Sequence, residues 1–371
     1  MRKILLIALS FLSFGFCYAQ QTIDLAGEWR FVMGDKPEYN DKIQLPGSMI
    51  TNNKGDIITV DTKWTGSLYD SSFYFNPYME KYRKAGEMKF PFFLTPPKHY
   101  VGNAWYQKTV FVPKTWKKQR IYLYLERPHI ETTVFVNGQV AGRDSSLSVP
   151  HEFDVTPYII YGKDNVIAVK VYNGAENVCV GLDSHSVTDQ TQGNWNGIAG
   201  KISLTARPQT HIKNVQIYPR LSDMSIEVKL QMANANKKQK ATFIITPYHY
   251  VSKQEAPVFT KDILLSSANG EGQSVRLENL DLRLWNEFTP NLYTLTAIVG
   301  KDTVNTVFGM RDIKIEGYDF YVNGVKTYMR GTLDCCCFPL TGYPPTDVES
   351  WLTIFRKCKE YGLNQMRFHS Y

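Results

Sequence analysis

The sequence has few cysteines, no apolar run of eighteen or more residues after its first segment, and little charge of one sign. Of its 371 residues six are cysteine, and 42 Lys and Arg against 35 Asp and Glu give a formal net charge of only +7. Such a small and dispersed net charge excludes a clustered basic surface for binding nucleic acid. The missing apolar run excludes a membrane-spanning helix in the mature protein. Hydrophobic residues at 43% and charged residues at 21% are those of a globular chain, and the length predicts more than one domain.

The cysteine count also excludes a disulfide scaffold. If Cys17 is removed with a leader, an odd number remains, at positions Cys179, Cys335, Cys336, Cys337 and Cys358. On a strand, side chains alternate between faces, so only Cys335 and Cys337 of the consecutive three would share a face. We expect these cysteines to be small apolar fillers at the end of a buried strand, and we expect no metal and no cofactor. A zinc or redox site is the weaker alternative.

Residues 1–19 resemble an export signal. Arg2 and Lys3 are followed by an apolar stretch at 4–16 and by the small-x-small end Cys17-Tyr18-Ala19. We expect a periplasmic or secreted protein; Cys17 as a lipid-acceptor cysteine is the alternative, disfavoured by the bulky Phe16 before it.

Residues 20–208 show short strand-like runs separated by turn residues and almost no helical spacing. Asn137-Gly138 lies between two such runs and predicts a type I′ hairpin. We expect an antiparallel jelly-roll sandwich here. The stretch 61–97 lacks periodicity and is rich in Tyr, Phe, Gly, Lys and Pro, so we interpret it as a long loop insertion. We expect it to pack on a neighbouring domain; packing on substrate is the alternative.

Residues 209–311 repeat the strand rhythm and predict an immunoglobulin-like β-sandwich of six or seven strands. The pattern changes in residues 312–371. Asn323-Gly324 predicts another hairpin, and a strand over 329–334 leads into a helix with Thr346 as N-cap, Glu349 completing a capping box, and Gly362 at its end.

A second strand over 363–368 makes this a β-α-β unit, parallel and right-handed. An eight-stranded β/α barrel needs roughly 250 residues, so we expect this unit to be the first part of a truncated TIM barrel.

The common catalytic motifs are missing: the sequence has no G-x-S-x-G, no phosphate-binding P-loop, no H-E-x-x-H and no dinucleotide fingerprint. In a β/α barrel, residues at the carboxyl ends of the strands face the active site. Asp334, Arg367 and His369 would lie there, where Arg can hold a carboxylate or a hydroxyl and Asp can accept from hydroxyls. A structural Arg–Asp contact is the alternative.

Several motifs together resemble glycoside hydrolase family 2, the family of β-galactosidases, β-glucuronidases and β-mannosidases. They are LAGEWRF at 25–31, LPGS at 45–48, YVGNAWYQK at 100–108, TVFVNGQVAGR at 133–143, GNWNGIAGKIS at 193–203, FGMR at 308–311, FYVNGVKTYMRG at 320–331 and KEYGLNQMRFH at 359–369. The resemblance covers the chain from about residue 22 onward.

The resemblance implies a retaining exo-β-glycosidase that removes terminal galactose or glucuronic acid, with a β-linked glycan as partner. The resemblance also implies that two catalytic glutamates lie on later barrel strands and that the acid/base glutamate follows an Asn. The only Asn-Glu pair here, Asn286-Glu287, falls in the immunoglobulin-like region, so we expect neither catalytic glutamate in this sequence. We therefore expect no turnover by this chain alone. In some members a loop of the first domain reaches the active site, which makes Trp195 and Asn196 candidate substrate contacts. A non-catalytic carbohydrate-binding protein of two sandwiches is the alternative.

Overall fold

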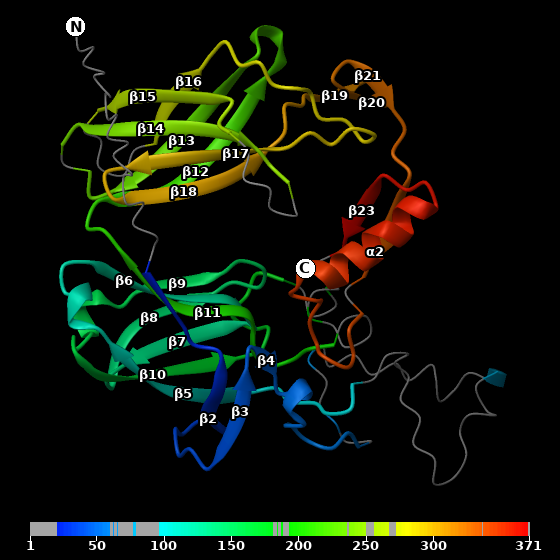
Figure 1. The fold of residues 1–371 in the computed structure, drawn as a ribbon. Helices are drawn as coiled ribbons and strands as arrows, with labels where there is room; N and C mark the ends of the chain where they lie inside the picture. The colour runs from blue at the N-terminus through cyan, green and yellow to red at the C-terminus, as the bar shows by residue number, and fades with distance from the viewer. Residues whose placement is uncertain are drawn as a thin grey trace, which may run out of the picture. The chain divides into compact units, whose positions relative to one another are not determined.

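The computed structural model describes residues 21–59, 62, 65, 77–78, 96–180, 184, 187, 193–235, 237–249, 256–266, 272–335 and 337–369. The expected export signal, most of the expected loop insertion and Cys336 lie outside these ranges. The described chain is mainly strands with a single α-helix (Figure 1). It divides into two compact units, one of them residues 210–285 with 289–311, the other residues 22–209, 286–288 and 312–371. Each is treated separately below.

The first sandwich consists of two antiparallel sheets. One has the order β1-β11-β6-β9 with β4 paired to β11, and the other has the order β3-β2-β5-β10-β7-β8. The strands are β1 (Gln21–Asp24), β2 (Gly27–Met33), β3 (Asp41–Leu45), β4 (Gly47–Ser48), β5 (Asn103–Val112), β6 (Arg120–Pro128), β7 (Glu131–Val136), β8 (Gln139–Ser145), β9 (His151–Asp154), β10 (Lys163–Tyr172) and β11 (Gly197–Arg207). Among the described residues, 3-10 turns lie at Ile50–Asn52, Lys114–Trp116, Thr156–Tyr158 and, in the other unit, Leu221–Asp223.

Alternating strands build the core of this sandwich. In β6, for example, Ile121, Leu123 and Leu125 are fully buried while the residues between them are partly exposed, as period-2 patterning requires. The predicted hairpin at Asn137-Gly138 is confirmed: both residues have positive φ, 50° and 80°, and β7 pairs antiparallel with β8.

The second sandwich has a three-stranded sheet, β12-β13-β16, and a four-stranded sheet, β15-β14-β17-β18. Its strands are β12 (His211–Arg220), β13 (Ser225–Ala233), β14 (Gln239–Pro247), β15 (Phe259–Leu265), β16 (Gln273–Leu277), β17 (Tyr293–Val299) and β18 (Asp302–Phe308). It has a core of its own around Phe243, Leu230 and Leu295. Six of these seven strands match the predicted runs; β15, where exposed residues dominate, gave no strand signal.

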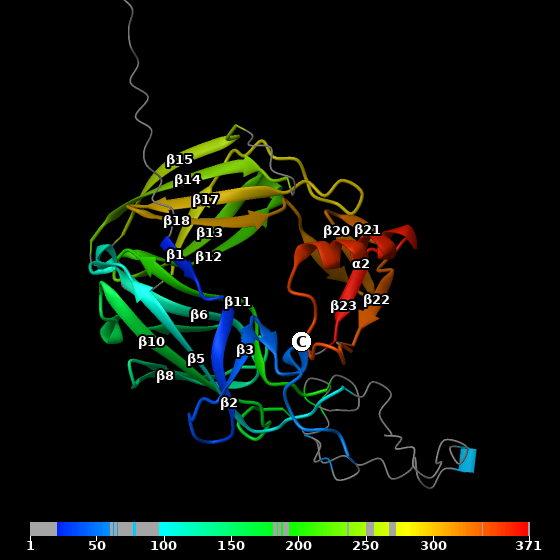
Figure 2. The ribbon, with the colours of Figure 1, turned by 60° about the horizontal axis from the view of Figure 1, so that its bottom comes forward.

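The terminal segment, residues 312–369, contains a three-stranded sheet and a β-α-β unit. The elements are β19 (Ile313–Glu316), β20 (Asp319–Val322), β21 (Val325–Thr327), β22 (Gly331–Asp334), α2 (Val348–Glu360) and β23 (Gln365–Phe368). β22 and β23 pair in parallel, as the sequence predicts, and α2 lies along one face of the pair (Figures 1 and 2). Continuation of this unit into a closed barrel stays a prediction.

Two details of this unit differ from the expectations. The N-cap of α2 is Asp347, whose carboxylate accepts from the Ser350 N–H at 2.8 Å, so the predicted capping box on Thr346 is wrong. The strand β22 is half exposed, Cys335 after it is only partly buried and Cys337 is exposed, so these two cysteines do not fill the end of a buried strand. The end of α2 is as predicted, because Gly362 takes a left-handed φ of 74°.

Candidate functional site

The carboxyl ends of β22 and β23 lie side by side and form the first part of the candidate site. Their parallel register pairs Leu333 with Arg367 and Asp334 with Phe368. The His369 N–H then donates to the Asp334 carbonyl oxygen at 2.8 Å. The structure therefore brings Asp334, Arg367 and His369 to one edge, where the sequence predicts them.

The side chains at this edge divide between two faces. Phe368 points to α2, where its ring meets that of Trp351 edge-on at 5.3 Å. Alternation puts Arg367 and His369 on the opposite face, away from α2, whereas Asp334 shares the face of Phe368. The side chain that meets His369 is that of Cys335, with Sγ 4.0 Å from Nδ1. Sequence reasoning missed this pair because it assigned the cysteines to packing.

The thiol of Cys337 has a raised pKa. Partial burial raises its pKa, and the neighbouring Cys335 and Asp334 raise it further, which favours the protonated thiol. The four described cysteines, 179, 335, 337 and 358, are all free thiols. Within the described ranges no three His, Cys, Asp or Glu side chains gather to hold a metal ion. No helix in those ranges has the length and apolarity that a bilayer crossing needs.

Asn196 lies inside the first sandwich, where it is 1% exposed. Its Oδ1 accepts from the Tyr106 hydroxyl at 2.7 Å, and its Nδ2 donates to the carbonyl oxygens of Gly102 and Val171 at 3.1 and 3.2 Å. These bonds occupy both ends of the amide. Asn196 therefore links parts of the sandwich to one another. Its contact with substrate stays a prediction, and it would require these hydrogen bonds to break.

Trp195 is also buried, at 5% exposure, but it lies where the first sandwich meets the terminal segment. One face of its indole stacks on His129, with ring centroids 4.6 Å apart and planes 8° apart. The Tyr343 ring, from the loop between β22 and α2, lies 5.2 Å from it. In this structure the indole is thus covered by protein, and a direct contact with sugar stays a prediction.

His129 is a neutral ring in this stack. Burial lowers its pKa to about 3; a hydrogen bond with Asn194 opposes this shift, and the Arg127 charge adds to it. Among the described residues no hydrogen-bond partner reaches its Nε2. The ring contributes packing at ordinary pH and no charge.

A polar cluster fixes the starts of β22 and β23. Arg330 and Asn364 exchange hydrogen bonds, the Asn364 N–H to the Arg330 carbonyl at 2.9 Å and the Arg330 N–H to Asn364 Oδ1 at 2.8 Å. Glu287 accepts from both side chains, at 3.2 Å from Arg330 and 2.5 Å from Asn364. The glutamate of the single Asn-Glu pair is thus an anchoring residue for this sheet.

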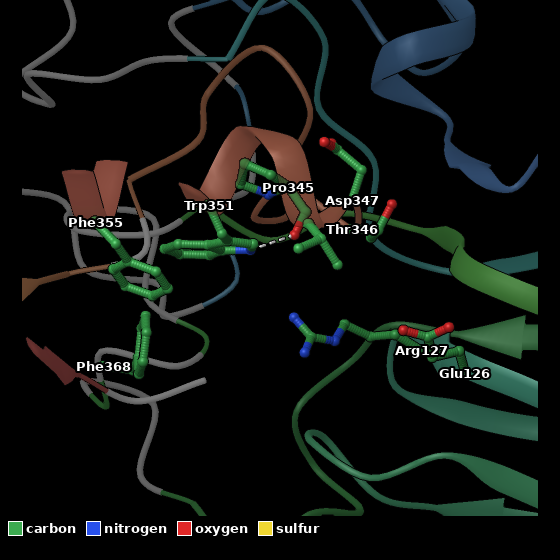
Figure 3. Close-up of a pocket in the computed structure, with 9 residues that line it drawn as sticks. Glu126, Arg127, Pro345, Thr346, Asp347, Trp351, Phe355 and Phe368 are labelled. Atoms are coloured by element: carbon green, nitrogen blue, oxygen red, sulfur yellow. Dashed lines mark hydrogen bonds between the residues drawn. The ribbon is translucent and has the colours of Figure 1, made fainter. Parts of the chain in front are cut away.

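A pocket of about 450 Å³ opens between the end of β6 and the first turns of α2 (Figure 3). It is lined by Glu126, Arg127, Pro345, Thr346, Asp347, Val348, Trp351, Phe355 and Phe368. The three aromatic rings form one wall and Arg127 faces them from the other side; the Trp351 indole N–H donates to the Pro345 carbonyl at 2.8 Å. Phe355 and Phe368 are 37% and 43% exposed, so this wall is the uncovered apolar face of the β-α-β unit.

This architecture defines the class as modular, mainly β proteins in which two sandwiches precede an α/β unit. Within that class the chain belongs to the glycosyl hydrolases family 2. The model of the family's sugar-binding domain matches residues 23–208, and a second model, described as glycosyl hydrolases family 2, matches residues 210–311.

Individual relatives agree with this assignment. A β-galactosidase of Priestia megaterium is 27% identical over 325 residues, which cover 83% of this chain and 30% of the relative. A β-glucuronidase of Streptococcus agalactiae is 23% identical over 331 residues, which cover 84% of this chain and 47% of the relative.

A solved structure has the same fold. The β-glucuronidase of Ruminococcus gnavus in complex with D-glucaro-d-lactam superposes with a TM-score of 0.67 at 17% identity, over 95% of this chain and 56% of that one. The chain spans about a third to a half of the length of curated relatives that it matches.

Proposed function

We propose that the whole protein is an exported, retaining exo-β-glycosidase that removes terminal β-linked galactose or glucuronic acid from glycans. Family membership supports glycoside hydrolysis, and the named relatives support these two sugars. The basic and apolar start of residues 1–19 supports export. We propose domains at 20–208, 209–311 and 312–371, the last being the start of the catalytic domain.

The observation that carries the proposal is the parallel β22-α2-β23 unit. It presents Arg367 and His369 at the carboxyl end of β23, on the face turned away from the helix. This is the face that lines the active site of a β/α barrel. The aromatic wall of the pocket in Figure 3 supports the same proposal, because further helices of a barrel would cover it.

The chemistry is a double displacement by two carboxylates about 5–5.5 Å apart, one a nucleophile and one an acid/base. In the proposed enzyme both come from later barrel strands. Arg367 has the donor geometry to hold a sugar carboxylate in two parallel hydrogen bonds, or to donate to hydroxyls. Its contribution is to bind and orient the sugar, while His369 and Cys335 border the same edge.

The test is hydrolysis of chromogenic β-galactosides and β-glucuronides by the protein at its natural length, with the product anomer followed by NMR. We expect cleavage of at least one of the two, with the β anomer appearing first. Inversion, or turnover of neither sugar, would contradict the proposal, and sugar binding without turnover would favour a non-catalytic binding protein.

Arg367→Ala tests the site directly. We expect kcat/KM to fall by roughly 10- to 100-fold, because a charge-assisted hydrogen bond to the substrate is lost. Arg356→Ala, which removes an exposed arginine of α2, is the matched control and should leave kcat/KM unchanged. Equal effects of the two substitutions would place Arg367 outside the site.

The 371-residue chain alone is expected to hydrolyse none of these substrates, because the proposed carboxylates are not within it. Pure chain assayed at high concentration gives the answer. Turnover that follows the purified chain through a second column would contradict this expectation.

A further inference from the structure

The loop between β22 and α2 is held at its tip by the first sandwich. The tip, residues 341–343, lies against a socket formed by Ser48, Thr51 and Trp195. Ser48, which is fully buried, donates its hydroxyl to the Thr341 carbonyl oxygen at 2.5 Å. The Tyr343 side chain hydrogen-bonds Thr51, and its ring packs on Trp195.

The socket is itself rigid. The Ser48 N–H donates to Thr51 Oγ1 at 3.0 Å, and the Thr51 N–H returns a bond to Ser48 Oγ at 3.1 Å. Pairing of β4 with β11 places Ser48 beside Gly197, two residues after Trp195. His129 closes the back of the indole by stacking on it. The tip therefore contacts residues that are also bonded to one another.

Gly342 makes the close approach possible. Its φ of 85° is left-handed, and a Cβ added there would lie 2.5 Å from the Cβ of Trp195. A contact this short cannot be made by any residue with a side chain. The glycine at the tip thus fits the close contact with the Trp195 indole. A loop that only covered apolar surface would not need a glycine at this position.

We propose that Trp195 and His129 are positioning residues for the candidate site: they clamp the loop tip and thereby fix the carboxyl end of β22. This inference rests on the proposed function, in which that end borders the active site. Cys335 begins the clamped loop, and Asp334 accepts from the His369 N–H, so movement of the loop is transmitted to both strand ends. Trp195 acts through the loop and does not touch the sugar. Displacements of about 1 Å at such a site cost up to 100-fold in rate.

Gly342→Ala in the natural-length enzyme tests the clamp, and Gly324→Ala is its matched control. Gly324 has a similar φ of 78° but open space around it, so its alanine variant carries the backbone strain without the clash. We expect Gly342→Ala to lower kcat at least tenfold with KM changed less than twofold. Gly324→Ala should leave both constants within twofold of wild type.

Hydrogen exchange on the 371-residue chain provides a readout independent of activity. In Gly342→Ala we expect at least tenfold faster exchange at the amides of residues 341–343 and 369, but not in the hairpin around Gly324. If Gly342→Ala does not fold, Trp195→Leu and Trp195→Phe replace it. The leucine variant should lose protection and kcat, and the phenylalanine variant, which keeps an aromatic ring, should recover most of both.

The possible outcomes separate the two proposals. Faster exchange with an unchanged kcat would overturn the positioning role while the glycosidase function stands. Unchanged exchange would overturn the clamp itself. An inactive wild-type enzyme would overturn the proposed function, and the exchange data would still decide whether Trp195 and His129 hold the loop.

Discussion

Single buried polar residues hold the first sandwich to one arrangement. Asn196 bridges a tyrosine hydroxyl and two backbone carbonyls, and Asn173 beside it donates to the Tyr100 carbonyl at 2.7 Å and the Trp195 carbonyl at 3.1 Å. Buried groups of this kind contribute little net free energy when they are paired. They become costly when one partner is removed.

Asn196→Ala is therefore expected to lower the free energy of unfolding of the sandwich by about 2–3 kcal/mol, because several buried groups lose their partner. Urea unfolding of the 371-residue chain, followed by fluorescence, measures the change. Asn177→Ala is the control, since it removes an exposed asparagine that bonds to Glu131, and should be nearly neutral. A loss below 0.5 kcal/mol at Asn196, the range usual for surface changes, would refute the crosslink.

His129 makes stability depend on pH. Its pKa is about 3 in the folded chain and near 6.5 when unfolded, so between these values the unfolded state binds a proton that the folded state does not. The free energy of unfolding is therefore highest, as far as His129 is concerned, above pH 6.5, and it decreases as the pH falls from 6.5 towards 3. The slope is at most about 1.4 kcal/mol per pH unit.

We expect His129→Phe, which keeps a ring on Trp195, to flatten the dependence of the unfolding free energy on pH between 4 and 6. Urea titrations at several pH values provide the measurement. An unchanged slope in His129→Phe would show that the ring is protonated in the folded chain.

At the scale of elements, α2 depends on its N-terminal cap because little of the helix is buried. Asp347 begins the helix with bonds from both the N–H and the hydroxyl of Ser350, each at 2.8 Å. No residue of α2 is fully buried, and Val348 is 56% exposed. The capping bonds therefore matter more to this helix than they would in a helix held by a core.

Asp347→Ala is expected to speed hydrogen exchange severalfold in the first turn of α2, because the orphan N–H of Ser350 loses its acceptor. Thr346→Ala, one residue earlier, should have no such effect. The hydrogen bonds also lower the pKa of Asp347, so wild-type protection should fall only when acid protonates this carboxylate. A larger effect at Thr346 would restore the capping box predicted from the sequence.

At the scale of the whole molecule, the two largest hydrophobic cores among the described residues are separate. One is centred on residues such as Trp29 and Leu123 in the first sandwich, and the other on residues such as Phe243 and Leu295 in the second. The division into two compact units follows these cores. Each unit has enough buried apolar surface to unfold cooperatively by itself.

Calorimetry is expected to show two transitions that respond to different substitutions. Phe243→Ala should destabilise the second sandwich by about 3–5 kcal/mol and Leu123→Ala the first by about 2–5 kcal/mol, through lost burial and the cavity left behind. Each substitution should shift one transition only. A common shift in both variants would indicate a single cooperative unit.

The sequence by itself determined most strands, both Asn-Gly hairpins, the parallel β-α-β unit and the family, because these depend on local patterning and on runs of neighbouring residues. Only the tertiary structure decided which side chains meet. It pairs Cys335 with His369, uses Asp347 as the cap, and buries Asn196 in hydrogen bonds to residues about 25 to 94 positions away. The physical reason is that burial and non-local hydrogen bonding depend on how sheets and loops pack, which no local pattern encodes.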